Sequence, residues 1–386
     1  MVISYKRDKS MKKIVIIGAN SFQNRLILKA KKLGYETHVF AWQCGDIGEY
    51  TADYFYPISI TEKEEILEKC RVIAPDAIAS IASDLAVLTV DYVARNLGLI
   101  ANSEICDKIA TNKYEMRRAL LEAGIPTPAF YKVTEKGRVQ ESIDFTHPWI
   151  VKPTDRSGSR GVTKVMNQDE LEPAVKAAQE QSFEKSAIVE EFIDGTEYSA
   201  ECISYRGIHH LLAVTEKFTT GAPHFIEIGH LQPALTDSVQ RESLKKVIFS
   251  ALDALDIKYG ASHSEFKIKK DGTIRIIEIG ARMGGDCIGS DLVFMSTGND
   301  FVKMVIDVAS GKKPEILQCT DPKPAAVRFI MNKNDLLLLE EPEIHIADKV
   351  DINAEFLHEV VDSSTRFGYF LATGESIEEL KKNLFK

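Results

Sequence analysis

The sequence lacks the features that mark nucleic-acid-binding and membrane proteins. Its 48 Lys and Arg residues are outnumbered by 57 Asp and Glu residues, which leaves a net charge of -9. Proteins that neutralise many phosphates usually carry a basic excess, so no nucleic-acid partner is expected. The most apolar stretch, residues 72–90, is interrupted by Pro75, Asp76 and Asp84, so no membrane span is expected.

The sequence is also poor in cysteine motifs. Six cysteines occur, and no two of them are spaced as a CxxC pair. A chain of 386 residues can bury a core without disulfides, so free thiols in a reducing compartment are the simplest interpretation. The basic residues at the start are not followed by an apolar run, so no signal peptide is expected. These observations favour a cytoplasmic protein.

Two common nucleotide-binding motifs are missing. The apolar run 13–17 and Gly18 predict a buried strand followed by a turn. The glycines of G-x-G-x-x-G are absent from the next positions, which hold Asn20, Phe22 and Gln23, so a dinucleotide site is not expected there. The chain also lacks the GK[ST] of a Walker A loop.

The chain does contain an alternation of short apolar runs and amphipathic segments. Its N-terminal part runs strand–helix–strand–helix, which implies a parallel sheet with helices on both faces, an α/β arrangement. Thr61 and Glu64 have the spacing of a capping box. From Trp149 onward, strands with glycine turns predict an α+β arrangement, and the tail from about 321 predicts a further small α+β unit. Strands are expected at 13–17, 36–42 and 76–80, and helices at 61–71, 84–97, 112–123, 168–181 and 237–255.

A predicted hairpin brings two glutamates together. Residues 263–269 and 273–279 flank an Asp271-Gly272 turn, and a two-residue loop there sets Glu265 opposite Glu278. Facing carboxylates repel unless a cation lies between them, and hard oxygen ligands favour Mg²⁺. The alternatives are two glutamates on a solvated strand face, or a register shifted by a bulge.

Two further segments suggest contacts with a nucleotide. Lys152 ends an apolar strand and precedes the loop TDRSGSRGV, whose small and basic residues suit a flexible flap, residues 155–162, over phosphates. A plain surface hairpin is the alternative. The strand at 187–193 breaks before Glu197, so its free backbone could contact an adenine edge and Glu197 a ribose. An ordinary acidic hairpin turn is the alternative there.

Two segments suggest contacts with a substrate. Arg282 follows Glu278 closely and suits a developing oxyanion or a transferring phosphoryl group, although it could simply pair with a carboxylate. The stretch 215–230 holds His224, Glu227 and His230. Their spacing is not HExxH, and an extended chain points Glu227 away from both histidines, so a polar loop over a substrate pocket is favoured over zinc. Ordinary loop histidines are the alternative.

Together these motifs resemble the ATP-grasp carboxylate–amine ligases, and look closest to bacterial L-amino-acid ligases and phosphoribosylglycinamide synthetase-like proteins. The match is collinear from about residue 11 to the end of the chain. The resemblance implies an ATP-grasp fold with three parts. These are a pre-ATP-grasp α/β domain at 1–107, an ATP-grasp domain at 108–315 with a flap subdomain at about 148–214, and a C-terminal α+β subdomain at 316–386.

The resemblance also implies a role for individual residues. Arg282 and Lys152 would be catalytic, and Glu265 and Glu278 would bind the metal. Lys217, His224, Glu227, His230, Gly284, Gly285 and Asp286 would face the substrates. The nucleotide would be bound by Lys113, Lys152, Arg156, Ser157, Gly158, Ser159, Gly161, Glu190, Glu191, Phe192, Ile193 and Glu197.

One position departs from the family pattern. The family usually has Glu-x-Asn after the second metal strand, and the Asn is a further metal ligand; here that position is Gly280. Either water or Asp286 completes the metal shell, or a second Mg²⁺ is held more weakly. ATP and Mg²⁺ are the implied cofactors, and Mn²⁺ is possible.

The resemblance implies a two-step reaction on small molecules. A substrate carboxylate would attack the γ-phosphate of ATP to give an acyl phosphate and ADP, and an amine would then displace phosphate. An amino acid is the favoured carboxylate. The alternatives are a purine-pathway or carboxylating enzyme that uses a sugar-phosphate amine or bicarbonate, and a nucleotide-binding protein without turnover. A homodimer is possible, since relatives are often dimers.

Overall fold

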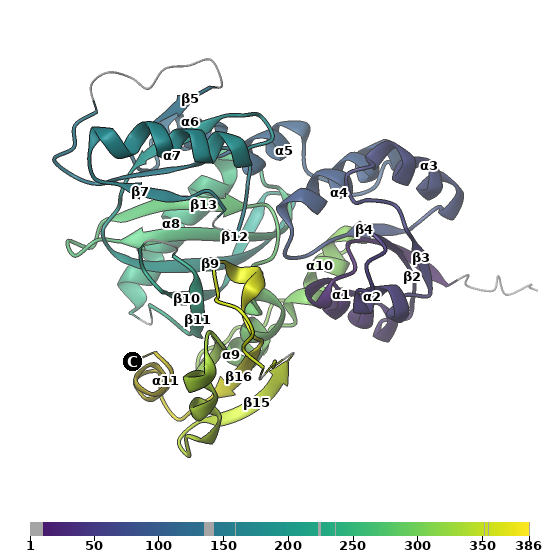
Figure 1. Ribbon diagram of the computed structural model, residues 1–386. Helices are drawn as coiled ribbons and strands as arrows, with labels where there is room; N and C mark the ends of the chain where they lie inside the picture. Colours follow the sequence, from purple (N-terminus) through teal and green to yellow (C-terminus); the bar gives the residue numbers. More distant parts are fainter. Residues whose placement is uncertain are drawn as a thin grey trace, which may run out of the picture. The chain divides into compact units, whose positions relative to one another are not determined.

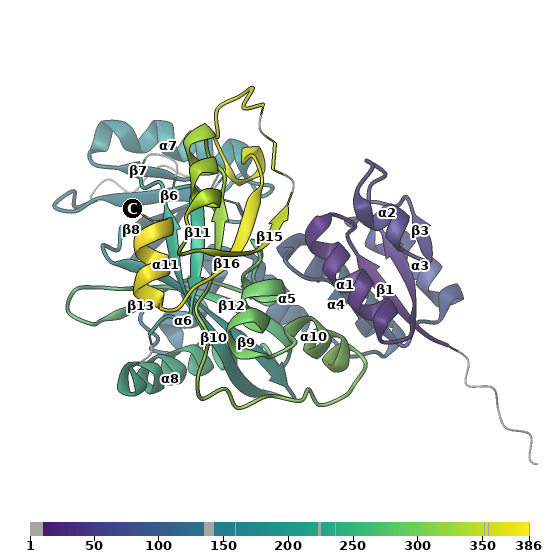
Figure 2. The same ribbon diagram turned by 90° about the horizontal axis from the view of Figure 1, so that it is seen from below.

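The computed structural model describes residues 11–134, 143–158, 160–222, 225–235, 237–350, 352–353 and 355–385. They form two compact units, one from residues up to 101 with 302–314, the other from 102–301 with 315 onward (Figures 1 and 2). Across these described ranges, no helix has both the length and the apolar character needed to cross a membrane.

The first unit is built on a parallel sheet in the order β3-β2-β1-β4. Every residue of β1 from Ile14 to Ile17 is fully buried, so both faces of the sheet are covered. This confirms the expected parallel sheet between helices. The strands are β1 (Lys12–Ile17), β2 (Tyr35–Phe40), β3 (Tyr54–Tyr56) and β4 (Ala77–Ala79). The helices are α1 (Ser21–Lys32), α2 (Ile47–Thr51), α3 (Lys63–Ile73), α4 (Asp84–Leu97) and most of α10 (Phe301–Ala309).

One helix start in this unit differs from the prediction. α3 begins after Glu62, and no side chain caps its first turn. Thr61 is not the N-cap; its hydroxyl lies 2.9 Å from that of Ser59. The capping box expected from Thr61 and Glu64 is therefore wrong, because a local hydroxyl contact holds Thr61 outside the helix.

The second unit contains two sheets. The larger runs β13-β12-β9-β10-β11-β14-β16-β15, and the smaller runs β5-β8-β6-β7 with helix α7 packed against it (Figure 1). The small sheet consists of β5 (Phe130–Val133), β6 (Trp149–Pro153), β7 (Thr163–Val165) and β8 (Ala187–Glu191). The large sheet consists of β9 (Thr196–Tyr205), β10 (Ile208–Thr219), β11 (Glu227–Gln232), β12 (Tyr259–Ile268), β13 (Ile274–Gly280), β14 (Ala325–Phe329), β15 (His345–Val350) and β16 (Tyr369–Thr373).

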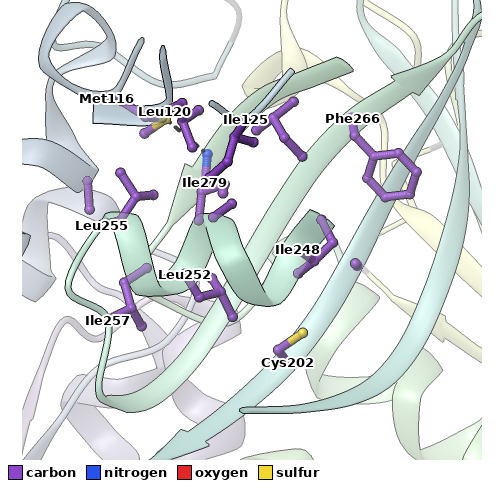
Figure 3. Close-up of a cluster of buried hydrophobic side chains, with 14 of the residues drawn as sticks. Met116, Leu120, Ile125, Cys202, Ile248, Leu252, Leu255, Ile257, Phe266 and Ile279 are labelled. Carbon is purple, nitrogen blue, oxygen red and sulfur yellow. Dashed lines mark hydrogen bonds between the residues drawn. The ribbon is translucent and has the colours of Figure 1, made fainter. Parts of the chain in front are cut away.

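The helices of the second unit bury the main core against the large sheet. Met116 and Leu120 of α6 and Ile248 and Leu252 of α8 gather with Phe266 on the same face (Figure 3). The helices are α5 (Glu104–Thr111), α6 (Lys113–Glu122), α7 (Gln168–Gln181), α8 (Ser238–Ala254), α9 (Val293–Thr297) and α11 (Ile377–Leu384). Short π and 3₁₀ turns are η1 (Ile288–Leu292), η2 (Lys333–Glu340) and η3 (Ser363–Thr365).

The chain passes from one sheet to the other at residues 192–195. β8 belongs to the small sheet and β9 to the large one, so the predicted strand break is a crossover rather than a hairpin turn. The C-terminal strands β14, β16 and β15 extend the large sheet beyond β11. The domain boundaries expected at 107 and 315 stay predictions.

The β12–β13 hairpin pairs Glu265 with Glu278, as expected, although its loop differs. The amide of Lys269 donates to the carbonyl of Thr273, so the loop has three residues, and only Gly272 has a positive φ, of 81°. A bulge at Ile277 then restores the register, because Glu265 pairs with Glu278 but Phe266 pairs with Ile276. The prediction of a two-residue turn is therefore wrong. A three-residue loop needs only one residue in the left-handed region, and Gly272 provides it.

Candidate active site

The second unit contains a cavity of about 1170 Å³, including its open mouth, that is lined from both sheets. The small sheet and its β6–β7 loop provide one wall, and strands β9 to β13 provide the other. The cavity brings together most of the residues that the sequence singled out. These are Lys113, Lys152, Arg156, Ser157, Gly158, Glu190, Glu191, Phe192, Ile193, Glu197, Lys217, Glu227, Glu265, Glu278 and Arg282.

Other expected site residues do not line this cavity. Gly161, at φ 66°, lies against Pro153 and Gln181. A Cβ on Gly284 would lie 2.7 Å from Nδ1 of His263 and 2.8 Å from a carboxylate oxygen of Glu201, so this glycine lets the backbone approach a buried pair. His230, Gly285 and Asp286 are also absent from the lining residues. Ser159 and His224 lie outside the described residues.

Lys152 and Glu190 are a buried ion pair that lines the cavity. Lys152 Nζ lies 2.6 Å from Glu190 Oε2, and Nε of Arg117 lies 2.7 Å from the other oxygen. Burial alone would raise the pKa of Glu190, but the two cations outweigh it and hold this pKa below its usual value. The Glu190 side chain is thus committed to cations rather than turned toward an adenine.

The adenine hinge expected at 190–193 has few free amides. The amide of Glu191 donates to the carbonyl of Ala129 at 2.9 Å, and that of Phe192 to Pro148 at 3.0 Å. The Phe192 ring remains at the cavity wall, with the ammonium groups of Lys164 and Lys267 at 3.9 and 5.2 Å from its centroid. An aromatic face at this position suits stacking against a base better than hydrogen bonding to the edge of a base.

A lysine ammonium lies on each of the two paired carboxylates. Lys113 Nζ is 2.9 Å from Glu278 and 2.6 Å from the carbonyl of Arg156. Lys217 Nζ is 2.5 Å from Glu265, 3.4 Å from Glu197 and 3.8 Å from Glu227. Burial alone would lower the pKa of Lys217, but the three carboxylates raise it above its usual value.

This arrangement fits a metal ion that arrives with phosphates. Among the described residues, no three His, Cys, Asp or Glu side chains gather closely enough to hold a metal. Mg²⁺ does not need such a cage, because it binds through one or two carboxylates and completes its shell with water and phosphate oxygens. Glu265 and Glu278 face each other at a cavity whose opposite wall carries Lys152 and Arg156, so they meet that requirement.

Sequence reasoning missed His263, which lines the cavity beside Glu265. Its Nδ1 contacts the buried carboxylate of Glu201, and its Nε2 lies 3.2 Å from Glu265 Oε1. Burial alone would lower the pKa of His263, but Glu201 outweighs it and raises this pKa to about 9. The alternation of His263 with Glu265 along one strand was the signal that could have found it.

Residues of the C-terminal segment pair with two of the acidic side chains that the sequence singled out. Arg366 holds both oxygens of Asp286, at 2.9 and 2.8 Å, and Ser363 donates to Glu227 at 2.8 Å. The Asp286 carboxylate is thus paired with an arginine, and its part in completing a metal shell beside Gly280 stays a prediction.

The geometry of His230 also differs from the prediction. A bulge at Ile228 pairs Lys217 with His230 and Thr219 with Glu227, so Glu227 and His230 face the same side. The His230 side chain is nevertheless buried, and its Nε2 lies 3.9 Å from Asp286. Burial lowers the pKa of His230 below its usual value.

The Asp286–Arg366 pair is expected to stabilise the fold in a pH-dependent way. Asp286→Asn should cost about 3 kcal/mol at pH 7, because it leaves the buried guanidinium of Arg366 without its carboxylate. Burial alone would raise the pKa of Asp286, but His230 and Arg366 hold it below its usual value. This stabilisation is therefore full above about pH 4 and is lost as the pH falls.

Urea unfolding at several pH values tests this expectation. The difference in stability between the wild type and Asp286→Asn should be full at pH 7 and should shrink progressively as the pH falls below about 4. Asp321→Asn is the matched control, because the Asp321–Lys323 pair is exposed and should contribute less than about 1 kcal/mol. A difference that does not change with pH would contradict the assignment.

Part of the chain matches a known domain family. Residues 145–291 match the family of ATP-grasp domains. The alanine–anticapsin ligase of Bacillus subtilis is 25% identical over 245 residues, which cover 58% of this chain and 51% of that protein. The chain thus spans about half the length of the curated relatives it matches.

Two solved structures share the fold over nearly the whole chain. The L-amino acid ligase from Bacillus licheniformis has a TM-score of 0.82 at 24% identity, covering 96% of this chain and 95% of its own. Phosphoribosylglycinamide synthetase from Anaerococcus prevotii has a TM-score of 0.74 at 21% identity, covering 97% and 96%. Residues 145–291 thus match the ATP-grasp domain family, and the chain as a whole shares the fold of these two structures. Structures of other proteins with this fold hold ADP, and one holds ADP with magnesium.

Proposed function

We propose that this chain is an ATP-dependent carbon–nitrogen ligase that activates a small carboxylate, favoured to be an amino acid, and couples it to an amine. The observation that carries the proposal is the single cavity in which Lys113 and Lys152 meet the paired carboxylates and Arg282. That combination suits phosphoryl transfer, where catalysis is mostly positioning and electrostatic stabilisation.

The residues of the cavity have distinct parts in such a reaction. Lys113 and Lys152 would neutralise the phosphates while a substrate carboxylate oxygen attacks the γ-phosphorus and ADP leaves. Mg²⁺, held by Glu265 and Glu278, would neutralise further negative charge on the phosphates. Arg282 would stabilise the acyl phosphate and the oxyanion that forms when the amine attacks and phosphate departs. The loop around residues 155–162 would exclude water, which would otherwise hydrolyse the mixed anhydride.

The charges at the substrate side favour an amino acid over a sugar phosphate. A phosphorylated substrate requires unpaired cations, but Lys217 contacts three glutamates and Arg366 holds Asp286. Glu227 lines the cavity there, and a carboxylate suits the ammonium group of an amino acid. A bicarbonate-dependent or sugar-phosphate enzyme is the second candidate, because several proteins of this fold are N5-carboxyaminoimidazole ribonucleotide synthetases.

The decisive experiment measures ADP and phosphate release from Mg-ATP against amino acids, singly and in pairs, with bicarbonate included. Release that requires two amino acids would support the ligase and identify both substrates. Release that requires bicarbonate would favour the carboxylating alternative. No release with any mixture, together with a melting temperature that Mg-ATP still raises, would favour nucleotide binding without turnover.

The three-domain division, a cytoplasmic location and a homodimer remain part of the proposal. A related biotin carboxylase domain forms a dimer, which supports the last of these. Size-exclusion chromatography with light scattering would measure the oligomeric state directly.

A further inference from the structure

Arg117 is a fully buried arginine that no motif had singled out. It lies on α6, four residues after Lys113, so both side chains leave the same face of the helix. Its Nε lies 2.7 Å from Glu190, and its Nη2 donates to the carbonyl of Ile277. Arg117 is not among the residues that line the cavity.

The two partners of Arg117 belong to opposite walls of the cavity. Glu190 is on β8 of the small sheet, and Ile277 is the bulge residue of β13 in the large sheet. A bulge residue is left outside the strand ladder, so its carbonyl is available to a side chain. A guanidinium has several N–H groups in a fixed planar arrangement, so it can contact a carboxylate and a carbonyl at once. A lysine ammonium group does not offer the same geometry.

The charges around Glu190 do not balance. One carboxylate is shared by two cations, the ammonium of Lys152 at 2.6 Å and the guanidinium of Arg117 at 2.7 Å, so the three groups carry one net positive charge. Lys152 lines the cavity and Arg117 does not, so this surplus charge is exposed to a ligand only at Lys152. Without Arg117, the pair of Lys152 and Glu190 would be neutral.

We propose that Arg117 is a positioning residue for nucleotide binding. It shares Glu190 with Lys152 and thereby leaves the charge of that lysine to the phosphates of a nucleoside triphosphate, while it ties the two walls of the site together. The inference rests on the proposed function in one respect: it assumes that a nucleoside triphosphate binds in the cavity.

The test measures the dissociation constant for Mg-ATP by calorimetry, without carboxylate or amine, beside the melting temperature of each free variant. Arg117→Met should raise the dissociation constant about tenfold or more, because Lys152 is then neutralised by Glu190. Adding Glu190→Gln should restore most of the affinity, because it removes the carboxylate that neutralises Lys152. A purely structural arginine predicts no such rescue.

Arg328 supplies the matched control. It is also buried, it pairs with one carboxylate, Asp335, at 2.8 Å, and it does not line the cavity. Arg328→Met should lower the melting temperature and leave the dissociation constant for Mg-ATP unchanged. The control therefore distinguishes the general effect of removing a buried arginine from the specific effect of removing Arg117.

Several outcomes would overturn the inference. An unchanged affinity in Arg117→Met would do so, and so would a double variant that binds as weakly as Arg117→Met. If Arg117→Met does not fold, Glu190→Gln alone decides: the proposal requires that it bind Mg-ATP at least as tightly as the wild type. Failure of the wild type to bind Mg-ATP would remove the proposed function and this inference together, whereas the other results remove the inference alone.

Discussion

Glu278→Gln is expected to reduce ADP release at least about a hundredfold, because the amide cannot neutralise a divalent cation at the point where phosphate charge develops. Glu278 faces Glu265 across the hairpin and lines the cavity, so its loss removes one of these two paired carboxylates. Its side chain is about 28% exposed and pairs with Lys113, so the fold should tolerate a neutral residue of equal size.

The measurement is ADP release with the substrates found for the wild type, together with Mn²⁺ binding followed by paramagnetic resonance in the presence of ATP. Glu216→Gln is the matched control, since Glu216 lies on the same sheet, pairs with Lys381 and does not line the cavity. Both variants should melt within a few degrees of the wild type. Turnover unchanged by Glu278→Gln would refute the metal assignment.

The hairpin that carries these glutamates shows how far local patterns lead. The alternation of apolar and polar residues along the two strands, together with the Asp-Gly turn, was sufficient to place Glu265 opposite Glu278. The loop nevertheless contains three residues instead of two, which shifts the pairing of the two strands by one residue. The bulge at Ile277 reverses this shift, so the glutamates still face each other. Loop length and bulges depend on the packing of neighbouring elements. Here the guanidinium of Arg117, on α6, donates to the carbonyl of Ile277. The pattern of the two strands alone could therefore not determine the bulge.

Long-range partners were the part that the sequence did not predict. Arg117 is one of several basic residues in the helix KYEMRRALLE, and nothing in that segment shows that a buried carboxylate lies 73 positions later at Glu190. Likewise, the break after β8 was expected, but the transfer of the chain to another sheet follows from tertiary pairing. The loop residues Arg156, Ser157 and Gly158 could be selected from local sequence, and they line the cavity. The charge network of Arg117, Lys152 and Glu190 depends on tertiary contacts and could not be selected in this way.

Lys152→Ala is expected to weaken Mg-ATP binding by about tenfold or more while changing the stability of the free protein little. The lysine is buried and lines the cavity, so it would contribute a charge-assisted hydrogen bond to phosphate. In the free protein, its removal leaves Glu190 paired with Arg117, so no buried carboxylate is abandoned. This separation of binding from stability distinguishes a ligand-binding lysine from a structural one.

Calorimetry with Mg-ATP and thermal unfolding without nucleotide measure the two quantities. Lys132→Ala is the matched control: Lys132 is on β5 of the same sheet, pairs with Glu184 at 3.3 Å and does not line the cavity. The control should leave the dissociation constant for Mg-ATP unchanged. If Lys152→Ala instead lowers the melting temperature by the same amount with and without nucleotide, Lys152 serves the fold. The phosphate site would then depend on Lys113 and the loop arginines, because these are the remaining cations on that side of the cavity.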